Sequence, residues 1–360
     1  GKYRLKNVPQ LRDTFTMKRL LEMVGATVHY ENNIMDIDTS GCDTPIAPYE
    51  LVKTMRASFY VLGPLLSRFN YAEVSLPGGC AWGPRPVNYH LQAMEALGAE
   101  VDLSDGMIIA KGKLKGAQIN FERSSVGATG NALMAAVNST GTTIIKNAAQ
   151  EPEVTDLIYC LKKMGAKITG ENTSTLVVQG VDHLSGIDYS ICPDRIEAGT
   201  YLVAAAITGG KIIVNNIEPD SMRAVIGKLI ETGADIQTNQ NSIKLDMKGK
   251  RPQPVDIRTS AYPNFPTDMQ AQFVALNSIA DGNATVTETI FENRFMHVQE
   301  IARMGGQISL KGNTAFIEGT DFLVGAPVMA TDLRASASLV LAGLVASGET
   351  IIDRIYHIDR

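Results

Sequence analysis

The sequence predicts a two-domain α/β protein assembled from repeated units of helix and strand. Two helix patterns alternate along the chain, and short strands around polar turns follow them. The chain has 360 residues, of which 44% are hydrophobic, so it is longer than one ordinary core accommodates and suits two domains.

The first repeated element is an amphipathic helix that ends in Gly-Ala or Gly-Gly. Glycine at this position favours the left-handed backbone that terminates a helix. Alternating residues then predict short strands, for example over residues 27–30 and 307–310. The five glycines, roughly seventy residues apart and so more widely spaced than solenoid repeats, are Gly25, Gly98, Gly165, Gly233 and Gly305.

The second repeated element is a helix that is apolar all round, which predicts burial. The pattern is clear over residues 202–207 and 339–344, and strands are expected after two of the copies at residues 142–145 and 211–214. Each unit therefore combines one buried helix, one surface helix and a small sheet. The five copies begin near Arg56, Ser125, Arg195, Asp268 and Arg334.

Six such units in two groups of three predict a pseudosymmetric pair of domains. The midpoint of the chain falls near Cys192. We therefore expect residues 1–192 to form the domain with Cys80, and residues 193–360 to form the domain with Asp268 and Arg360. The sixth unit lacks part of its pattern, so we expect the second domain to be truncated at its end.

Charge and cysteine content exclude several classes of function. A net charge of -5 and a pI near 5.6 leave no basic stripe for nucleic acid. The four cysteines are widely spaced without CxxC pairs, which favours reduced thiols in a cytoplasmic protein over disulfides or a zinc site. The sequence has no apolar run of 18 residues and no signal-like start, so we expect neither a membrane span nor secretion.

The segment 77–86 is the most chemically suggestive part of the chain. Glycines and prolines make it a stiff loop, and Cys80 lies five residues before Arg85. A thiol can act as an acid or a nucleophile, and an arginine can hold an anion. The alternative interpretation is a surface turn with a structural cysteine.

Arginines occupy the first turns of three predicted buried helices, where they oppose the helix dipole unless an anion neutralises them. These residues are Arg56, Arg195 and Arg334. Parallel helix starts of this kind predict an anion site. The alternative is ordinary ion pairing with nearby acids, namely Asp194, Glu197 and Asp332.

Two further segments contain candidate residues. Asp268 heads its helix, where an aspartate also serves simply as a cap or as a first-turn residue without any function. The loop at residues 289–297 is a candidate ligand-lining element, although we expect His297 itself to start a helix and bond a carboxylate. Dinucleotide, P-loop, zincin and serine-hydrolase motifs are absent from the sequence.

Taken together, these motifs resemble the enolpyruvyl transferase family, in its branch of UDP-N-acetylglucosamine 1-carboxyvinyltransferases. The resemblance runs from end to end, and the Cys80 loop separates this branch from the sister enzymes that act on shikimate 3-phosphate. The matching segments are residues 51–58, 77–86, 125–129, 193–197, 265–272, 291–297 and 331–338.

The resemblance implies both a fold and a reaction. The family fold is a two-domain inside-out α/β barrel of βαβαββ-like units that closes over substrate. The implied reaction transfers enolpyruvyl from phosphoenolpyruvate to the 3'-hydroxyl of UDP-N-acetylglucosamine and releases phosphate by addition and elimination. This is the first committed step of peptidoglycan precursor synthesis.

Roles carried over from the family fall on matching residues. Cys80 is implied to be the acid that protonates the methylene carbon of phosphoenolpyruvate and to react with electrophiles such as fosfomycin. Asp268 is implied to take the proton of the attacking hydroxyl. The implied phosphate-contacting arginines are Arg85 and Arg360, and those near the carboxylate are Arg294 and Arg334.

The family also implies contacts to the nucleotide sugar, several of them through the backbone. The implied contacts are Arg56, Arg85, Pro86, Val87, Asn88, Tyr89, Arg123, Ser124, Ser125, Val126, Asp268 and Ile290. Arg123 stands where relatives carry lysine, and positions 88 and 89 also vary in the family. The implied partners are the two substrates alone, without a metal, a cofactor or an obligate protein partner.

The resemblance also predicts that family segments are missing from both ends of the chain, including a lysine that contacts phosphoenolpyruvate. We therefore expect the 360 residues alone to have little activity and marginal stability. Two alternatives stay open: an enolpyruvyl transferase with another acceptor, and a noncatalytic paralogue that binds a nucleotide sugar. Retention of Cys80, Asp268 and Arg360 argues against the second.

Overall fold

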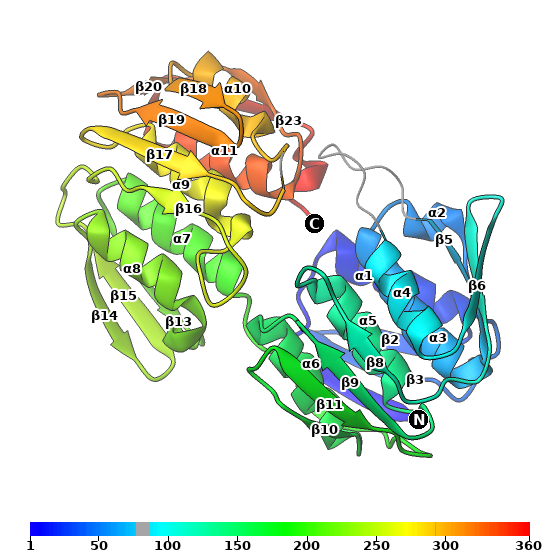
Figure 1. Ribbon diagram of the computed structural model, residues 1–360. Coiled ribbons are helices and arrows are strands. Elements are labelled where there is room, and N and C mark those ends of the chain that lie inside the picture. The colour runs from blue at the N-terminus through cyan, green and yellow to red at the C-terminus, as the bar shows by residue number, and fades with distance from the viewer. Residues whose placement is uncertain (77–86, 292) are drawn as a thin grey trace. The chain divides into compact units, whose positions relative to one another are not determined.

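The computed structural model describes residues 1–76, 87–291 and 293–360 (Figure 1). These residues divide into two compact parts, each the size of a predicted domain and larger than the repeated units. Unit 1 ends at Cys192, and unit 2 begins at Pro193. Each unit has its own hydrophobic core, and each is described by itself below. Among the described residues, no helix combines the length and the apolar character that a membrane span requires.

Unit 1 contains three four-stranded sheets of identical topology. In each, a parallel pair of strands continues into two antiparallel strands. The first sheet has the order β12 (Asp188–Ser190), β1 (Lys2–Lys6), β3 (Ile34–Asp38) and β2 (Thr27–Glu31). The second has β4 (Ile46–Ala47), β5 (Tyr71–Ser75), β7 (Met107–Lys111) and β6 (Glu100–Ser104). The third has β10 (Lys167–Thr169), β11 (Thr175–Gln179), β9 (Thr142–Lys146) and β8 (Gln118–Asn120).

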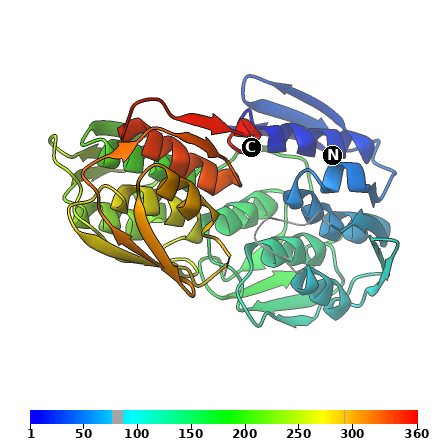
Figure 2. The ribbon, with the colours of Figure 1, turned by 90° about the horizontal axis from the view of Figure 1, so that it is seen from above.

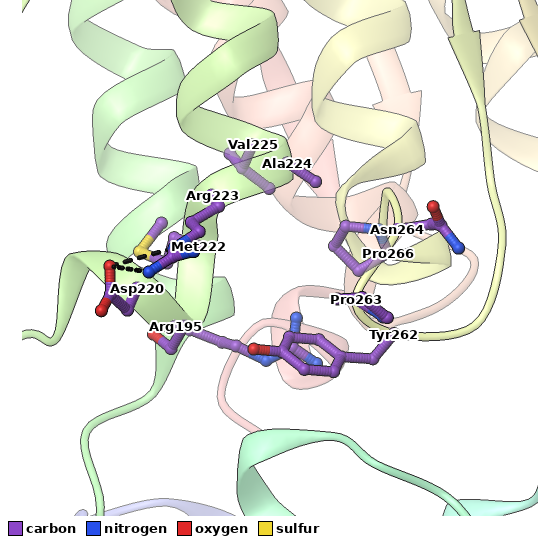
Figure 3. A pocket seen from close by; sticks show the side chains of 11 residues that line it. Arg195, Asp220, Met222, Arg223, Ala224, Val225, Tyr262, Pro263, Asn264 and Pro266 are labelled. Atoms are coloured by element: carbon purple, nitrogen blue, oxygen red, sulfur yellow. Dashed lines mark hydrogen bonds and ion pairs between the residues drawn. The ribbon is translucent and has the colours of Figure 1, made fainter. Parts of the chain in front are cut away.

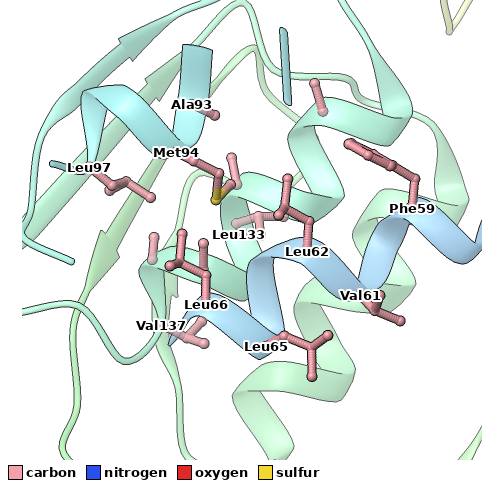
Figure 4. Close-up of a cluster of buried hydrophobic side chains, with 14 of the residues drawn as sticks. Phe59, Val61, Leu62, Leu65, Leu66, Ala93, Met94, Leu97, Leu133 and Val137 are labelled. Carbon is pink, nitrogen blue, oxygen red and sulfur yellow. The ribbon is translucent and has the colours of Figure 1, made fainter. Parts of the chain in front are cut away.

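The helices of unit 1 fall into the two expected kinds. The surface helices are α1 (Arg12–Met23), α4 (Asn88–Ala96) and α6 (Pro152–Lys163). The more apolar helices are α3 (Leu62–Phe69), which follows α2 (Tyr49–Val52) and the 3-10 helix η1 (Arg56–Val61), and α5 (Val126–Ala136). Leucines of α3 pack against Met94 of α4 and Leu133 of α5 in the core (Figure 4).

Unit 2 repeats this plan with a shorter last part. One sheet has the order β13 (Lys211–Asn215), β15 (Ser242–Asp246) and β14 (Asp235–Asn239). The next has β16 (Ile257–Arg258), β17 (Asn283–Thr287), β19 (Thr314–Glu318) and β18 (Gln307–Lys311). Two short parallel pairs follow, β20 (Leu323–Val324) with β22 (Ala346–Ser347) and β21 (Pro327–Met329) with β23 (Ile351–Asp353).

The helices of unit 2 also alternate. The surface helices are α8 (Arg223–Glu231), after the 3-10 helix η2 (Pro219–Met222), and α10 (Met296–Arg303). The apolar helices are α7 (Arg195–Ile207), α9 (Gln270–Asn277) after η3 (Thr267–Met269), and α11 (Leu333–Val345), and the short η4 (Ile355–His357) comes last. Helices α9 and α11 lie side by side in both views (Figures 1 and 2).

The five helix-ending glycines predicted from the sequence all have the expected conformation. Their φ angles are 104°, 92°, 109°, 93° and 90° in chain order, which lie in the region that side chains disfavour. The repeated units and the α/β class are therefore confirmed. The predicted strands at 142–145 and 211–214 correspond to β9 and β13.

The prediction that the apolar helices are buried all round is wrong for α11. Leu339 and Leu341 are buried, but Val340 is 38% exposed and Leu344 is 57% exposed. Helix α11 contacts α7, α9 and α10 within unit 2. Those neighbours cover one side of it, so its other side stays exposed within the unit.

Candidate active site

The clearest constellation of charged residues in unit 2 centres on Asp268. Its Oδ1 accepts a hydrogen bond from Arg294 Nη2 at 2.6 Å, and its Oδ2 accepts one from Arg334 Nη2 at 3.2 Å. Asp268 lies in η3 and its side chain caps no helix amide. Asp268 is therefore a first-turn residue, as the alternative interpretation allowed, but it is not a helix cap, because its carboxylate binds two arginines.

Different elements bring the two arginines to this carboxylate. Arg294 lies in the loop before α10 and is only 4% exposed, with its guanidinium 5.4 Å from the ring centroid of Phe291. Arg334 lies in the first turn of α11, where Asp332 accepts hydrogen bonds from the amides of Arg334 and Ala335. The Asp332 carboxylate thus caps α11, and the recorded ion pair of the Arg334 guanidinium is with Asp268.

The charges of this cluster determine the protonation of Asp268. Desolvation by the surrounding protein raises the pKa of Asp268, but the charges and hydrogen bonds of Arg334 and Arg294 outweigh it. The net result is a pKa well below the usual range of an aspartate, so the carboxylate is ionised at neutral pH. The side chain of Asp268 is 39% exposed, which leaves it accessible to a reacting group.

A second carboxylate, which no sequence motif indicates, is hydrogen-bonded to this cluster. Glu288 follows β17, is 1% exposed, and accepts a hydrogen bond from the Thr267 hydroxyl at 2.8 Å. Thr267 Oγ1 in turn accepts one from Arg294 Nη1 at 2.7 Å. Glu288 also accepts from the amide of Ile290 at 2.7 Å, which connects that predicted contact to the same network.

The histidines near the cluster are electrically neutral. His297 begins α10 as expected, but its Nε2 has no hydrogen-bond partner among the described residues, so the expected bond of this nitrogen to a carboxylate is not found. Burial lowers the pKa of His297 to about 4. Burial also lowers the pKa of His357, and the charge of Arg360 contributes to that shift.

The predicted nucleotide-sugar residues of unit 1 gather at the starts of α4 and α5. Asn88 begins α4, and the ring of Tyr89 lies 6.0 Å from that of Phe121. Ser125 caps α5 by accepting a hydrogen bond from the amide of Ala128 at 3.3 Å, and Val126 is the first residue of that helix. The two starts present backbone amides and partial positive charge, which suits an anion.

His90 and Asn131 join these two helices inside unit 1. Asn131 Nδ2 lies 3.0 Å from His90 Nδ1 and also donates to the carbonyl of Phe59 at 3.1 Å. Burial, with a contribution from the charge of Arg56, lowers the pKa of His90 to about 4. Arg56, the first residue of η1, is therefore within electrostatic reach of His90 in α4.

The remaining predicted site residues differ in burial and in position along the chain. Val87 is buried just before α4, whereas Arg123 and Ser124 are exposed before α5. Ile290 is 39% exposed, and Arg360 is the last residue of the chain. Cys80, Arg85 and Pro86 lie outside the described residues.

Arg195, the third arginine at a helix start, lines a hollow of about 240 Å³ instead of joining the Asp268 cluster (Figure 3). Its guanidinium lies 5.5 Å from the ring centroid of Tyr262. Asp194 accepts hydrogen bonds from the amides of Ile196 and Glu197 and so caps α7.

The family model for EPSP synthase (3-phosphoshikimate 1-carboxyvinyltransferase) matches residues 1–360, and the chain belongs to this family of enolpyruvyl transferases. Two relatives are named UDP-N-acetylglucosamine 1-carboxyvinyltransferase, one from Vesicomyosocius okutanii and one from Ruthia magnifica. Each is 60% identical over 100% of this chain and 86% of the relative. A relative of the same name from Shewanella amazonensis is 57% identical over 99% of this chain and 86% of its own length.

Solved structures share the fold at lower sequence identity. The enolpyruvyl transferase NikO from Streptomyces tendae matches with a TM-score of 0.89 and 24% identity, over 100% of this chain and 86% of that one. EPSP synthase from Acinetobacter baumannii matches with a TM-score of 0.72 and 18% identity, over 98% and 86%. These likenesses support the fold class predicted from the repeats.

Proposed function

We propose that the protein transfers the enolpyruvyl group of phosphoenolpyruvate to the 3'-hydroxyl of UDP-N-acetylglucosamine and releases phosphate. The observation that carries this proposal is the Asp268 carboxylate held between Arg294 and Arg334. One base beside two anion-binding forks matches a reaction between an alcohol and an anionic enol ester. The 60% identity to relatives named for this activity supports the choice of acceptor.

The proposed addition step uses an acid and a base. The 3'-oxygen bonds to C2 of phosphoenolpyruvate while Asp268 takes the hydroxyl proton, and the Cys80 thiol gives a proton to the methylene carbon. In the elimination, the new methyl group returns a proton to the Cys80 thiolate while the bond between C2 and the phosphate oxygen breaks, which restores the double bond. The proton taken by Asp268 leaves with the released phosphate. Asp268 is ionised at neutral pH, so its carboxylate has a lone pair with which to take the hydroxyl proton, and its lowered pKa makes it a weak base that depends on close positioning.

Arginines are proposed to hold the anionic groups of phosphoenolpyruvate. Arg294 and Arg334 bind its carboxylate, because each presents a planar fork of N–H donors. Arg85 and Arg360 bind its phosphate. Asp268 already partly neutralises Arg294 and Arg334. A substrate carboxylate would therefore bind these arginines in competition with Asp268, or beside it.

The nucleotide sugar is proposed to bind at the starts of α4 and α5, with Arg56 nearby. The amides of Ser125 and Val126 and the exposed Arg123 suit its diphosphate. Residues 85–89, Ser124 and Ile290 complete the proposed contacts.

We propose that this activity serves peptidoglycan precursor synthesis in the cytoplasm, and hence cell wall biogenesis, cell shape and division. Phosphate release by the protein, expressed over the whole length of its gene, tests the proposal. Release that requires both phosphoenolpyruvate and UDP-N-acetylglucosamine is expected. Release with shikimate 3-phosphate in place of the nucleotide sugar would favour another acceptor, and binding without release would favour the noncatalytic alternative.

A further inference from the structure

We infer that Glu288 is a positioning residue, which orients the Arg294 guanidinium through the hydroxyl of Thr267. The inference rests on the proposed function for the part that concerns substrate. Within the part of the chain that the structure describes, Glu288 forms no hydrogen bond with Asp268 or Arg334, so its effect on the cluster is indirect.

The position of Glu288 is fixed by its backbone. It follows β17, its amide donates to the carbonyl of Asn313 at 2.8 Å, and its carbonyl accepts from Asn313 Nδ2 at 2.8 Å. The residue is 1% exposed. A buried carboxylate held this firmly can serve as a reference point for the groups that bond to it.

The link to Arg294 depends on the single proton of the Thr267 hydroxyl. Thr267 Oγ1 donates this proton in a hydrogen bond to Glu288 Oε2 at 2.8 Å, so the lone pairs of Oγ1 are left to accept from Arg294 Nη1 at 2.7 Å. The other terminal nitrogen of Arg294 donates to Asp268 at 2.6 Å. The two terminal nitrogens of the guanidinium are therefore both held. The charged Glu288, which accepts from the Thr267 hydroxyl, strengthens the bond between that hydroxyl and Arg294 Nη1.

The second oxygen of Glu288 shapes the neighbouring loop. Its Oε1 accepts from the Thr259 hydroxyl at 2.8 Å and from the amides of Ile290 and Phe291 at 2.7 and 3.1 Å. Four donors thus converge on one carboxylate. Phe291 also lies against the Arg294 guanidinium, so both oxygens act on the surroundings of the same arginine.

Glu288→Gln separates the bond to Thr267 from the bonds to Thr259 and the loop amides, with little loss of packing. The amide oxygen of glutamine can still accept from Thr259 and the two loop amides, whereas its NH₂ would face Thr267 Oγ1. The Thr267 proton would then lose its acceptor. We expect kcat/KM for phosphoenolpyruvate to fall about tenfold or more, the size of one charge-assisted hydrogen bond.

A double-mutant cycle tests whether Glu288 acts through Thr267. Thr267→Val removes the hydroxyl, so adding Glu288→Gln to it should cost little further activity, and Thr267→Ser should keep nearly full activity. Asp256→Asn is the matched control, because Asp256 binds the amide and hydroxyl of Thr285 and no arginine. Losses that multiply in the double variant, or a Glu288→Gln variant with wild-type kinetics, would overturn the inference.

A second cycle needs no turnover and so separates this inference from the proposed function. Urea unfolding of Glu288→Gln, Arg294→Lys and the pair measures their coupling. With Thr267 present, we expect the pair to lose less free energy of unfolding than the sum of the two single variants. In a Thr267→Val background, we expect the two losses of free energy to add. Additive losses in both backgrounds would overturn the inference, whether or not the wild-type protein releases phosphate. A wild-type protein that releases no phosphate would count against the proposed function alone.

Discussion

Arg294 Nη2 donates a hydrogen bond to Asp268 Oδ1 over 2.6 Å, although Asp268 lies in η3 and Arg294 lies in the loop before α10. The contact joins the base proposed for the reaction to a group proposed to bind substrate. Any change to either residue should therefore affect both the ionisation of the site and its stability.

Asp268→Asn should lower the free energy of unfolding at pH 7 by about 1–2 kcal/mol, because two arginines lose a charged acceptor and the pair is only partly screened by solvent. The folded state holds the pKa of Asp268 below its ordinary value of 3.8. The stabilisation is therefore fully present above that value and is lost as the pH falls below it.

Urea unfolding at several pH values checks this prediction. The gap between wild type and Asp268→Asn should narrow below about pH 4. Asp36→Asn, which breaks an exposed pair with Arg4, is the control and should lose much less. A gap that widens in acid would contradict the assigned charge state.

His90 should make the protein less stable in mild acid. Its pKa is about 4 in the folded state against an ordinary 6.5, so the unfolded state binds the proton more tightly. Stability should therefore fall, on the order of 1–3 kcal/mol, as the pH drops from about 6.5 toward 4, and stay level above that range. Protonation would also place a second donor against the Asn131 amide.

His90→Gln should remove part of this pH dependence, because a glutamine oxygen can accept from Asn131 without charging. Thermal unfolding between pH 4 and 7 measures the slope. His29→Gln, on an exposed strand, should leave the slope unchanged. An unchanged slope in His90→Gln would assign the acid sensitivity to other groups, such as His297.

Gly63→Ala should destabilise unit 1 by about 1–3 kcal/mol through steric overlap. A methyl group at Gly63 would lie 2.5 Å from both the backbone oxygen and Oδ1 of Asn131. Gly227 in α8 is the matched control, because a methyl group there meets nothing within 4 Å. Gly227→Ala should stabilise by about 0.5–1 kcal/mol, and equal effects of the two changes on the unfolding midpoint would refute this packing argument.

Cys80→Ser should abolish covalent labelling by fosfomycin, because a hydroxyl is a much weaker nucleophile than a thiolate. Mass spectrometry of the intact protein measures the added mass. Cys160→Ser is the control and should label fully, since burial raises the pKa of the Cys160 thiol to about 11 and keeps it protonated. Labelling that persists in Cys80→Ser would remove Cys80 from its proposed role.

Local signals in the sequence were sufficient to predict the repeated units. Gly25 and its four counterparts end helices by a backbone preference that acts within a few residues, and that preference is visible without tertiary structure. The prediction for α11 failed because apolar composition does not report which side of a helix its neighbours cover.

Local sequence signals predict the site less completely than the repeated units. Motifs identified Asp268, Arg294 and Arg334, but the pairing of Asp268 with both arginines depends on contacts over 26 and 66 residues of chain. Nothing local distinguishes Glu288 from a surface acid between threonines. Its importance arises from four hydrogen-bond donors that the fold brings to it.

Phosphate release, measured with phosphoenolpyruvate and UDP-N-acetylglucosamine for the wild-type protein and Asp268→Asn, tests the central claim most directly. The proposed mechanism requires release that depends on both substrates, and a loss of at least a hundredfold in Asp268→Asn, as expected when a general base is removed. Wild-type rates in Asp268→Asn, or no dependence on UDP-N-acetylglucosamine, would contradict it.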